Sequence, residues 1–423
     1  MAVWGGGVRV ASNEDFFITK KAAAVFKHGI LSRYPVVFAA KAGMKVPGHR
    51  VSFLDGYAGR GCYDDGQPGS PLLLVASAER VDKFRAVRPI FVERDDDNFA
   101  NLSRVLAERG GAGKPVLYHQ SLDECLPQIL ELVKDDALFA FLDPFGPALD
   151  FELLRSGLLG RPPRPPTEVL LHFSVLSVAR MGGALRKAQA SGAPLTAAEL
   201  KSAQRLDRFL GGSWWQQHFA AVADVRDQQR ATAAAMSVAD RYRDMITKGT
   251  GFMSVSMPVR PRPDLLPKYV LVLFTRHVEG VWQFADCLGK AGADWRKACT
   301  AQAWQRTASP VPGQLDLFGL EAIVADADPD QQPGRQQWVA TIAANIWTLA
   351  RRVGPFRIAD RVTQVYGTTL GSAWIPHVRA AVADLYRRGL ILNDPKGAFQ
   401  YSLIRRCQPH PGWHSDAPLP STR

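Results

Sequence analysis

The chain has 423 residues, enough for two or three domains, and its 46% hydrophobic content supports sizeable cores. The formal net charge of +12 favours a polyanionic partner, although a generally basic soluble enzyme carries the same charge. No apolar stretch is long enough to span a membrane, the first 20 residues contain Glu14 and Asp15 in place of a signal core, and the five cysteines lack the paired short spacing of a zinc site. We therefore expect a cytoplasmic protein without a structural metal.

The first predicted strand, residues 51–54, runs into a glycine-rich turn. Ligands of open α/β sheets bind at the carboxyl ends of the strands, where this turn lies. The glycine spacing differs from the G-x-G-x-x-G of dinucleotide-binding proteins, so it suits a cofactor without a pyrophosphate, such as S-adenosylmethionine (SAM). The residues expected to line that cofactor are Asp55, Gly56, Ala58, Gly59 and Gly61.

Two further strands are expected to end in polar residues at the same edge. Residues 88–93 end in Glu93, the position from which a carboxylate accepts hydrogen bonds from ribose hydroxyls. Residues 116–119 are followed by Ser121 and Asp123, which are candidates for the adenine edge. Asp123 is equally placed to cap the helix that follows.

Residues 137–142 form an unbroken apolar run, as in a strand buried on both faces. The run delivers Asp143 to the ligand edge, and Pro144 keeps the backbone before it extended. Phe145 offers a flat face on which a base can stack. An exocyclic base amine is a poor nucleophile, and an oriented carboxylate with a neighbouring carbonyl would align its lone pair with a sulfonium methyl group.

Beyond Asp143, strands at residues 168–173, 252–257 and 269–274 complete a seven-stranded sheet whose last two strands form an antiparallel pair. Helical patterns occupy the insertion at about 180–250. We expect residues 1–305 to form one domain.

Several short motifs resemble those of three-Cys-motif partner proteins, the TcmP family. They are Lys27-His28-Gly29-Ile30-Leu31, the turn after Asp55, Gly69-Ser70-Pro71-Leu72, Phe91-Val92-Glu93 and Asp143-Pro144-Phe145-Gly146. The likeness covers most of residues 20–280. The Lys-His, Ala-Gly-x-Gly-x-Tyr and Pro-Gly-Ser-Pro motifs also resemble those of RlmJ-type ribosomal-RNA adenine-N6 methyltransferases.

The resemblance implies a class I SAM methyltransferase fold, a Rossmann-like, doubly wound sheet, acting on a nucleic-acid base. It places the cofactor on Asp55, Gly59, Gly61, Ser70 and Glu93 and the catalytic carboxylate at Asp143. Lys27 and His28 would contact the substrate or close the pocket. Adenine-N6 enzymes usually have two prolines after the acidic residue, whereas this Asp-Pro-Phe-Gly is similar to the motif of tRNA guanine-N2 dimethyltransferases, so the base stays open.

Residues 306–335 lack periodicity and are expected to be a flexible linker. They contain Gln314-Leu315-Asp316-Leu317-Phe318, which resembles the pentapeptide that docks bacterial repair proteins on the sliding clamp. Gln314, Leu315, Leu317 and Phe318 would be its anchors. The alternative is a short apolar segment packed against either domain.

Residues 336–406 contain ten Lys or Arg and only three acidic residues. Three helical patterns, at 338–352, 356–365 and 373–388, precede a predicted hairpin formed by 390–392 and 399–403, which is the order of a winged helix-turn-helix domain. His377, Arg379 and Lys396 would then lie near phosphates. Such modules also dock proteins. Residues 407–423 are expected to be a disordered tail.

The sequence therefore predicts a SAM-dependent methyltransferase that acts on an exocyclic base amine of RNA or DNA, adenine N6 being favoured, with a basic winged helix selecting the target. The alternative is a non-catalytic, SAM-binding adaptor in DNA repair. It would recruit a three-Cys-motif partner protein, which the TcmP resemblance implies, and the sliding clamp to DNA.

Overall fold

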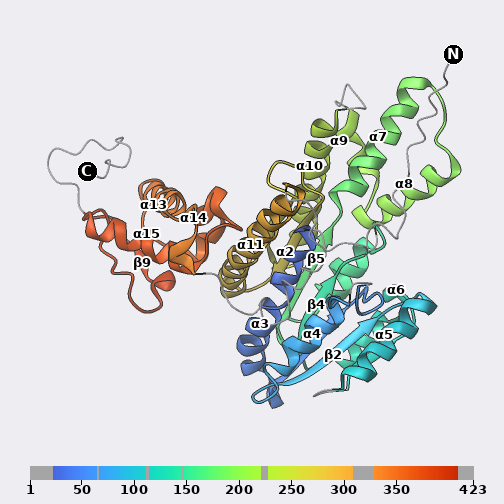
Figure 1. The fold of residues 1–423 in the computed structure, drawn as a ribbon, viewed down its shortest axis with the longest axis horizontal. Coiled ribbons are helices and arrows are strands. Elements are labelled where there is room, and N and C mark those ends of the chain that lie inside the picture. Colours follow the sequence, from blue (N-terminus) through green and yellow to red (C-terminus); the bar gives the residue numbers. More distant parts are fainter. Residues whose placement is uncertain are drawn as a thin grey trace.

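A computed structural model describes residues 22–63, 66–110, 114–144, 146–220, 227–307 and 328–407. A twisted sheet flanked by helices forms the larger part of the molecule, and a small helical module lies to one side of it (Figure 1). Within these ranges no helix combines the length and apolar character needed to cross a membrane.

The sheet has seven strands in the order β3-β2-β1-β4-β5-β7-β6. They are β1 (Arg50–Asp55), β2 (Ala86–Val92), β3 (Val116–Tyr118), β4 (Ala137–Leu142), β5 (Thr167–Phe173), β6 (Met253–Val259) and β7 (Tyr269–Thr275). Strands β1 to β5 are parallel, and β7 pairs antiparallel with both β5 and β6. The expected doubly wound sheet of seven strands is confirmed.

Strand β4 has apolar side chains on both faces of the sheet, so both faces must be packed against other elements. Phe139 and Phe141 enter the core on one face, whereas Leu138 and Leu142 enter the core on the other. Because side chains alternate along a strand, a continuous apolar run fits only a strand buried on both sides.

Helices on one face of the sheet come largely from the amino-terminal half of the chain. They are α2 (Ala22–Leu31), α3 (Tyr34–Ala42), α4 (Ser70–Glu79), α5 (Asp96–Arg109) and the long α11 (Val278–Thr307). The other face is covered by α6 (Leu122–Leu132), a π-helical turn (Leu153–Leu158), α7 (Val175–Ser191), α8 (Ala197–Leu210), α9 (Gln217–Ala220) and α10 (Gln228–Thr247). The helical insertion therefore begins at Val175, slightly before the expected position.

The carboxyl-terminal module contains three α-helices and a minimal sheet. The helices are α13 (Arg335–Arg352), α14 (Val362–Tyr366) and α15 (Ile375–Arg387), and the strands are β8 (Phe356–Arg357) and β9 (Leu403–Ile404). Leu392 and Cys407 also donate backbone hydrogen bonds that join residues 390–392 to the segment around β9.

Two details of this module differ from expectation. The segment Phe399–Tyr401 is a 3-10 turn and not strand, because Phe399 packs inward against Trp282 while the pairing begins at β9. The expected second helix begins instead with β8, which pairs with β9. Within the range expected to be a linker, Pro329–Gln331 forms a 3-10 turn, and the carbonyl of Pro329 lies 3.1 Å from His377 Nε2 of the module.

Glycines on α11 allow the module to pack closely on the larger domain. A Cβ atom at Gly289 or Gly292 would overlap the carbonyl oxygens of Ala373 or Gly371. Asp286 accepts a hydrogen bond from the backbone nitrogen of Ile375 at 3.0 Å. The absence of side chains at these two positions thus fixes how α11 and α15 approach.

A buried carboxyl group links β5, β7 and α3. Glu168 accepts hydrogen bonds from the hydroxyls of Tyr34 and Thr275, each at 2.6 Å. Burial raises the pKa of Glu168 to about 7, although both hydrogen bonds lower it. Tyr34 also lies 3.2 Å from the carbonyl of Gly280, so it keeps an acceptor when Glu168 is protonated.

We expect Glu168→Gln to flatten the pH dependence of stability. The folded pKa of about 7 exceeds the ordinary 4.5, so the stability linked to this proton is complete below pH 4.5 and is lost as the pH rises through 7. The loss amounts to about 3 kcal/mol for a fully buried group. Urea unfolding at pH 5 and pH 8 measures it; Glu108→Gln, at an exposed position, should leave the difference unchanged. An unaltered pH dependence in Glu168→Gln would contradict the assignment.

Candidate functional site

Asp143 is the centre of a polar cluster at the carboxyl end of β4. Lys27 Nζ, from α2, lies 2.5 Å from Asp143 Oδ2. His172 Nδ1, from β5, lies 3.2 Å from Asp143 Oδ1 but makes no hydrogen bond to it. The structure thus brings together two of the predicted catalytic residues, Lys27 and Asp143, which lie 116 residues apart.

The charges in this cluster determine its protonation. Burial favours a neutral Asp143, yet the positive charge of Lys27 and the neighbouring His172 hold the pKa of Asp143 below its usual value. Burial likewise opposes the charged form of Lys27, and attraction to Asp143 still raises the pKa of Lys27. Burial and Lys27 lower the pKa of His172. At neutral pH the cluster therefore contains a carboxylate, an ammonium group and a neutral imidazole.

Three aromatic residues around this cluster were not predicted as site residues. The ring of Tyr269, at the start of β7, lies 4.2 Å from the ring of His172. The hydroxyl of Tyr63 lies 3.3 Å from His28 Nε2. His172 and Tyr269 were visible only as members of apolar strands. The proximity of His172 to Asp143 depends on the pairing of β4 with β5, and that of Tyr269 on the pairing of β5 with β7, neither of which sequence spacing specifies.

The glycine-rich turn after β1 is held by Glu93. The backbone nitrogens of Gly59 and Asp95 donate to the two carboxylate oxygens of Glu93, each at 2.8 Å. Gly59 has φ +62°, and a Cβ there would meet no atom within 4 Å. Gly61 has φ +86°. Glu93 therefore orders the turn, and open space borders the backbone at Gly59.

Asp55 is the buried carboxyl group of this turn. Its Oδ1 accepts a hydrogen bond from the backbone nitrogen of Tyr57 at 3.2 Å, whereas Oδ2 is buried without a hydrogen-bond partner. Burial raises the pKa of Asp55 to about 7, although hydrogen bonds from the Ser70 side chain and the Tyr57 backbone lower it. Asp143 and Lys27 are close enough to affect this pKa, so the cofactor and catalytic candidates share one site.

The remaining cofactor candidates occupy neighbouring positions. Gly56 and Ala58 donate backbone hydrogen bonds to Phe141 and Val92, which anchors the turn to the sheet. Ser121, and not Asp123, is the N-cap of α6. Asp123 pairs with Arg208 at 2.8 Å, and Tyr57 lies near enough for Asp123 to raise its pKa.

Some predicted residues carry no structural description. Phe145 lies outside the described residues, and so do the sliding-clamp candidates Gln314, Leu315, Leu317 and Phe318. Pro144 is described and buried. In the described part of the chain no group of three or more His, Cys, Asp or Glu is arranged to hold a metal.

The prediction that His377 contacts phosphate is wrong, because that side chain is only 1% exposed. The backbone nitrogen of Trp374 donates to His377 Nδ1, and Nε2 lies 3.1 Å from the carbonyl of Pro329. Arg379 is exposed, yet its guanidinium binds the carbonyls of Pro395 and Gly397. Lys396 is 88% exposed and pairs with Asp394. Of the three, Lys396 is the one whose side chain is largely exposed and makes only a surface ion pair.

No family model matches the sequence, and no curated protein matches it. Among solved structures, the plantazolicin methyltransferase BpumL in complex with SAH is similar at 12% identity and TM-score 0.30, over 59% of this chain and 84% of that chain. The cyclopropane synthase MmaA2 from Mycobacterium tuberculosis is similar at 10% identity and TM-score 0.23, over 64% of this chain and 75% of that one. The mycolic acid cyclopropane synthase CmaA1 complexed with SAH and CTAB is similar at 11% identity and TM-score 0.23, over 60% of this chain and 73% of that chain.

The class of fold follows from the sheet itself. Five parallel strands with the order reversing between β1 and β4, and an antiparallel β7 between β5 and β6, form a Rossmann-like, doubly wound sheet. The polar cluster lies at the carboxyl ends of β1 and β4, the topological switch point at which such sheets bind ligands.

We expect Lys27→Met to destabilise the fold by about 2 kcal/mol at pH 7, because it leaves a largely buried carboxylate unpaired. The loss should shrink toward pH 4, where Asp143 can take up a proton. Urea unfolding at the two pH values measures both effects. Lys41→Met is the matched control, since the Lys41–Glu279 pair is more exposed and should contribute less than about 1 kcal/mol. Equal losses in the two variants would contradict the expectation.

Proposed function

We propose that the protein is a SAM-dependent methyltransferase acting on an exocyclic amine of a nucleic-acid base. The observation that carries the proposal is the ionised Asp143 at the end of β4, beside the glycine-rich turn that contains the buried Asp55. Asp143, the candidate for orienting the methyl acceptor, and Asp55, a candidate for binding the cofactor, lie at one edge of the sheet. Methyl transfer requires the two bound molecules to be held next to each other.

The residues of the turn fit SAM. The unpartnered Asp55 Oδ2 would accept an N–H or O–H donor of the cofactor, and the open backbone at Gly59 leaves room for it. Glu93 retains unused lone pairs for a ribose hydroxyl. When bound, SAM would supply an electrophilic methyl group.

Asp143 would orient the amine. A carboxylate only accepts hydrogen bonds, so an ionised Asp143 would accept one amine N–H and direct the nitrogen lone pair toward the methyl group. Lys27 keeps Asp143 ionised at neutral pH. The neutral His172 and the ring of Tyr269 form an adjoining wall, and His28 with Tyr63 lies at the same end of the sheet. Phe145 remains the candidate for stacking on the base.

The carboxyl-terminal module supports a nucleic-acid substrate. Its three helices and short β8–β9 pair support the proposed winged helix, and residues 336–406 hold ten basic and three acidic residues. Lys396 projects from the loop at the position of the wing.

A target base within a duplex would have to be flipped out, because its amine is otherwise paired within the stack. Adenine N6 of RNA or DNA is our favoured acceptor.

The Lys27–Asp143 pair also favours a second candidate function. The ammonium group already occupies one Asp143 oxygen at 2.5 Å, which suits a closed, structural site. In that case the protein would be a SAM-binding adaptor that recruits a three-Cys-motif partner protein, and the sliding clamp through residues 314–318, to DNA.

We expect SAM affinity to rise between pH 6 and pH 7.5 as Asp55 ionises, because the pKa of Asp55 without ligand is about 7. Calorimetric titration at several pH values measures it. Asp55→Asn should bind more weakly at pH 7.5 and lose most of this pH dependence. Asp97→Asn, at an exposed position of α5, is the control and should titrate like the wild type.

Asp143→Ala should reduce methyl transfer at least about 100-fold while SAM affinity changes less than about threefold, since the residue acts on the acceptor. Radiolabelled SAM incubated with separate DNA and RNA pools from cells lacking the gene measures transfer. Label from the wild type entering one pool would identify the polymer. SAM binding without transfer to either pool would favour the adaptor.

A further inference from the structure

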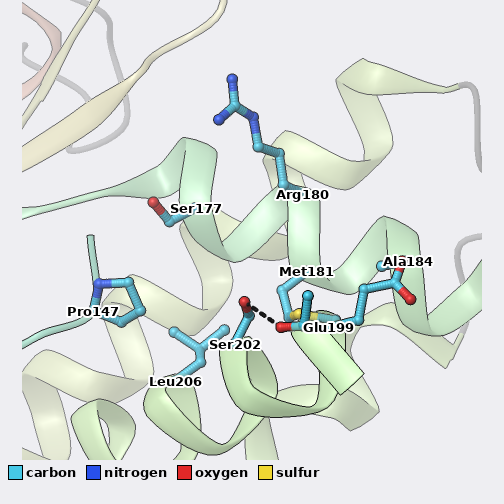
Figure 2. A pocket seen from close by; sticks show the side chains of 9 residues that line it. Pro147, Ser177, Arg180, Met181, Ala184, Glu199, Ser202 and Leu206 are labelled. Carbon is cyan, nitrogen blue, oxygen red and sulfur yellow. Dashed lines mark hydrogen bonds between the residues drawn. The ribbon is translucent and has the colours of Figure 1, made fainter. Parts of the chain in front are cut away.

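An open pocket of about 350 Å³ lies between α7 and α8. Its lining includes Pro147, Ser177, Arg180, Met181, Ser202 and Leu206. Figure 2 shows Pro147 at one side, Ser202 and Leu206 along α8, and the guanidinium of Arg180 extending past the rim. The volume is that of a small ligand site.

The chain connects this pocket directly to Asp143 and His172. Pro147 lies in the loop that follows Asp143, and Ser177 lies in the first turn of α7, which begins just after β5 and its His172. Pro147 and Ser177 thus line the pocket on the two segments that follow Asp143 and His172 along the chain. A substrate held at Asp143 would continue along these segments to reach the pocket.

The chemistry of the lining suits a nucleotide. Pro147, Met181 and Leu206 present apolar surface, and Ser177 and Ser202 add hydroxyl groups. Arg180 is exposed and makes no hydrogen bond or ion pair with any described residue, so its charge is available. The amino end of α7 adds a favourable dipole for an anion.

One carboxylate also lines the pocket. Glu199 is held in a capping box, where it accepts hydrogen bonds from the backbone nitrogen and hydroxyl of Thr196 at 2.8 and 2.7 Å. These hydrogen bonds partly compensate the negative charge of Glu199 at the start of α8. Figure 2 shows Glu199 on the side of the pocket opposite Pro147. Glu199 thus lies away from Pro147, and Arg180 supplies the positive charge of the lining.

We propose that this pocket receives the nucleotide adjacent to the target base and that Arg180 contacts its phosphate. The proposal rests on the proposed function and adds a place where the substrate strand next to the target base is held. Arg180 is a positioning residue, since it would hold the chain of the substrate while Asp143 orients the amine.

The test measures binding of mixed-sequence single-stranded DNA and RNA 20-mers to the full-length protein, by fluorescence anisotropy over a range of salt concentrations. Arg180→Gln should weaken binding about fivefold near 0.1 M salt and reduce the slope of log affinity against log salt by about 0.7, the value for one phosphate contact of a single strand. Ser202→Tyr, at an exposed position of the pocket, should also weaken binding by filling the space.

Lys83→Gln is the matched control, because it removes one exposed charge near the start of β2, at the opposite edge of the sheet. Binding by Arg180→Gln that equals that of Lys83→Gln, with an equal salt slope, would overturn the proposal, as would a wild type that binds neither oligonucleotide. SAM affinity, measured in parallel, should be unchanged in every variant. Loss of SAM binding or of methyl transfer in the wild type would instead count against the proposed function, so the two failures are separable.

Discussion

The need to neutralise one buried charge organises the site. Asp143 ends an entirely apolar strand, so its carboxylate lies where burial strongly disfavours ionisation. Lys27 compensates at 2.5 Å, and this requires α2 to cross the end of β4. The same helix carries His28, whose Nε2 lies 3.3 Å from the hydroxyl of Tyr63. A buried pair of this kind contributes little net stability but specifies one arrangement of the elements that carry it.

The same helix is fixed from its other side by α11. A Cβ atom at Gly29 would lie 2.9 Å from the Cβ of Ala291, so the two helices pack with almost no side chain between them. Arg33 and Asp294 add an ion pair at 2.8 Å. Small residues allow close approach, and the ion pair fixes the register along the helices. The Lys27 backbone is thus held by contacts that involve no residue of the candidate site.

The sequence was sufficient for the sheet and for part of the site, for identifiable physical reasons. All seven strands were predicted because their apolar runs are bounded by turn residues, and Asp55, Glu93 and Asp143 follow from their places at strand ends. His172 and Tyr269 were missed because their role depends on which strands become neighbours. His377 was misassigned because a histidine within a basic helix has the same sequence signature on either face; only the packing of Trp374 and Pro329 around it shows that it is buried.

The carboxyl-terminal module and the polar cluster are joined through one short stretch of α11. Asp286, Gly289 and Gly292 contact the start of α15 and the turn before it, whereas Ala291 and Asp294, between and beside them, contact α2. Adjacent residues of a helix face different directions, so one stretch of a helix can contact two different elements on its two sides. A displacement of α11 along its axis would therefore move both the surface on which the module packs and the surface that contacts Gly29. Lys27 lies two residues before Gly29, so the helix that supplies the partner of Asp143 and the carboxyl-terminal module pack against the same stretch of α11.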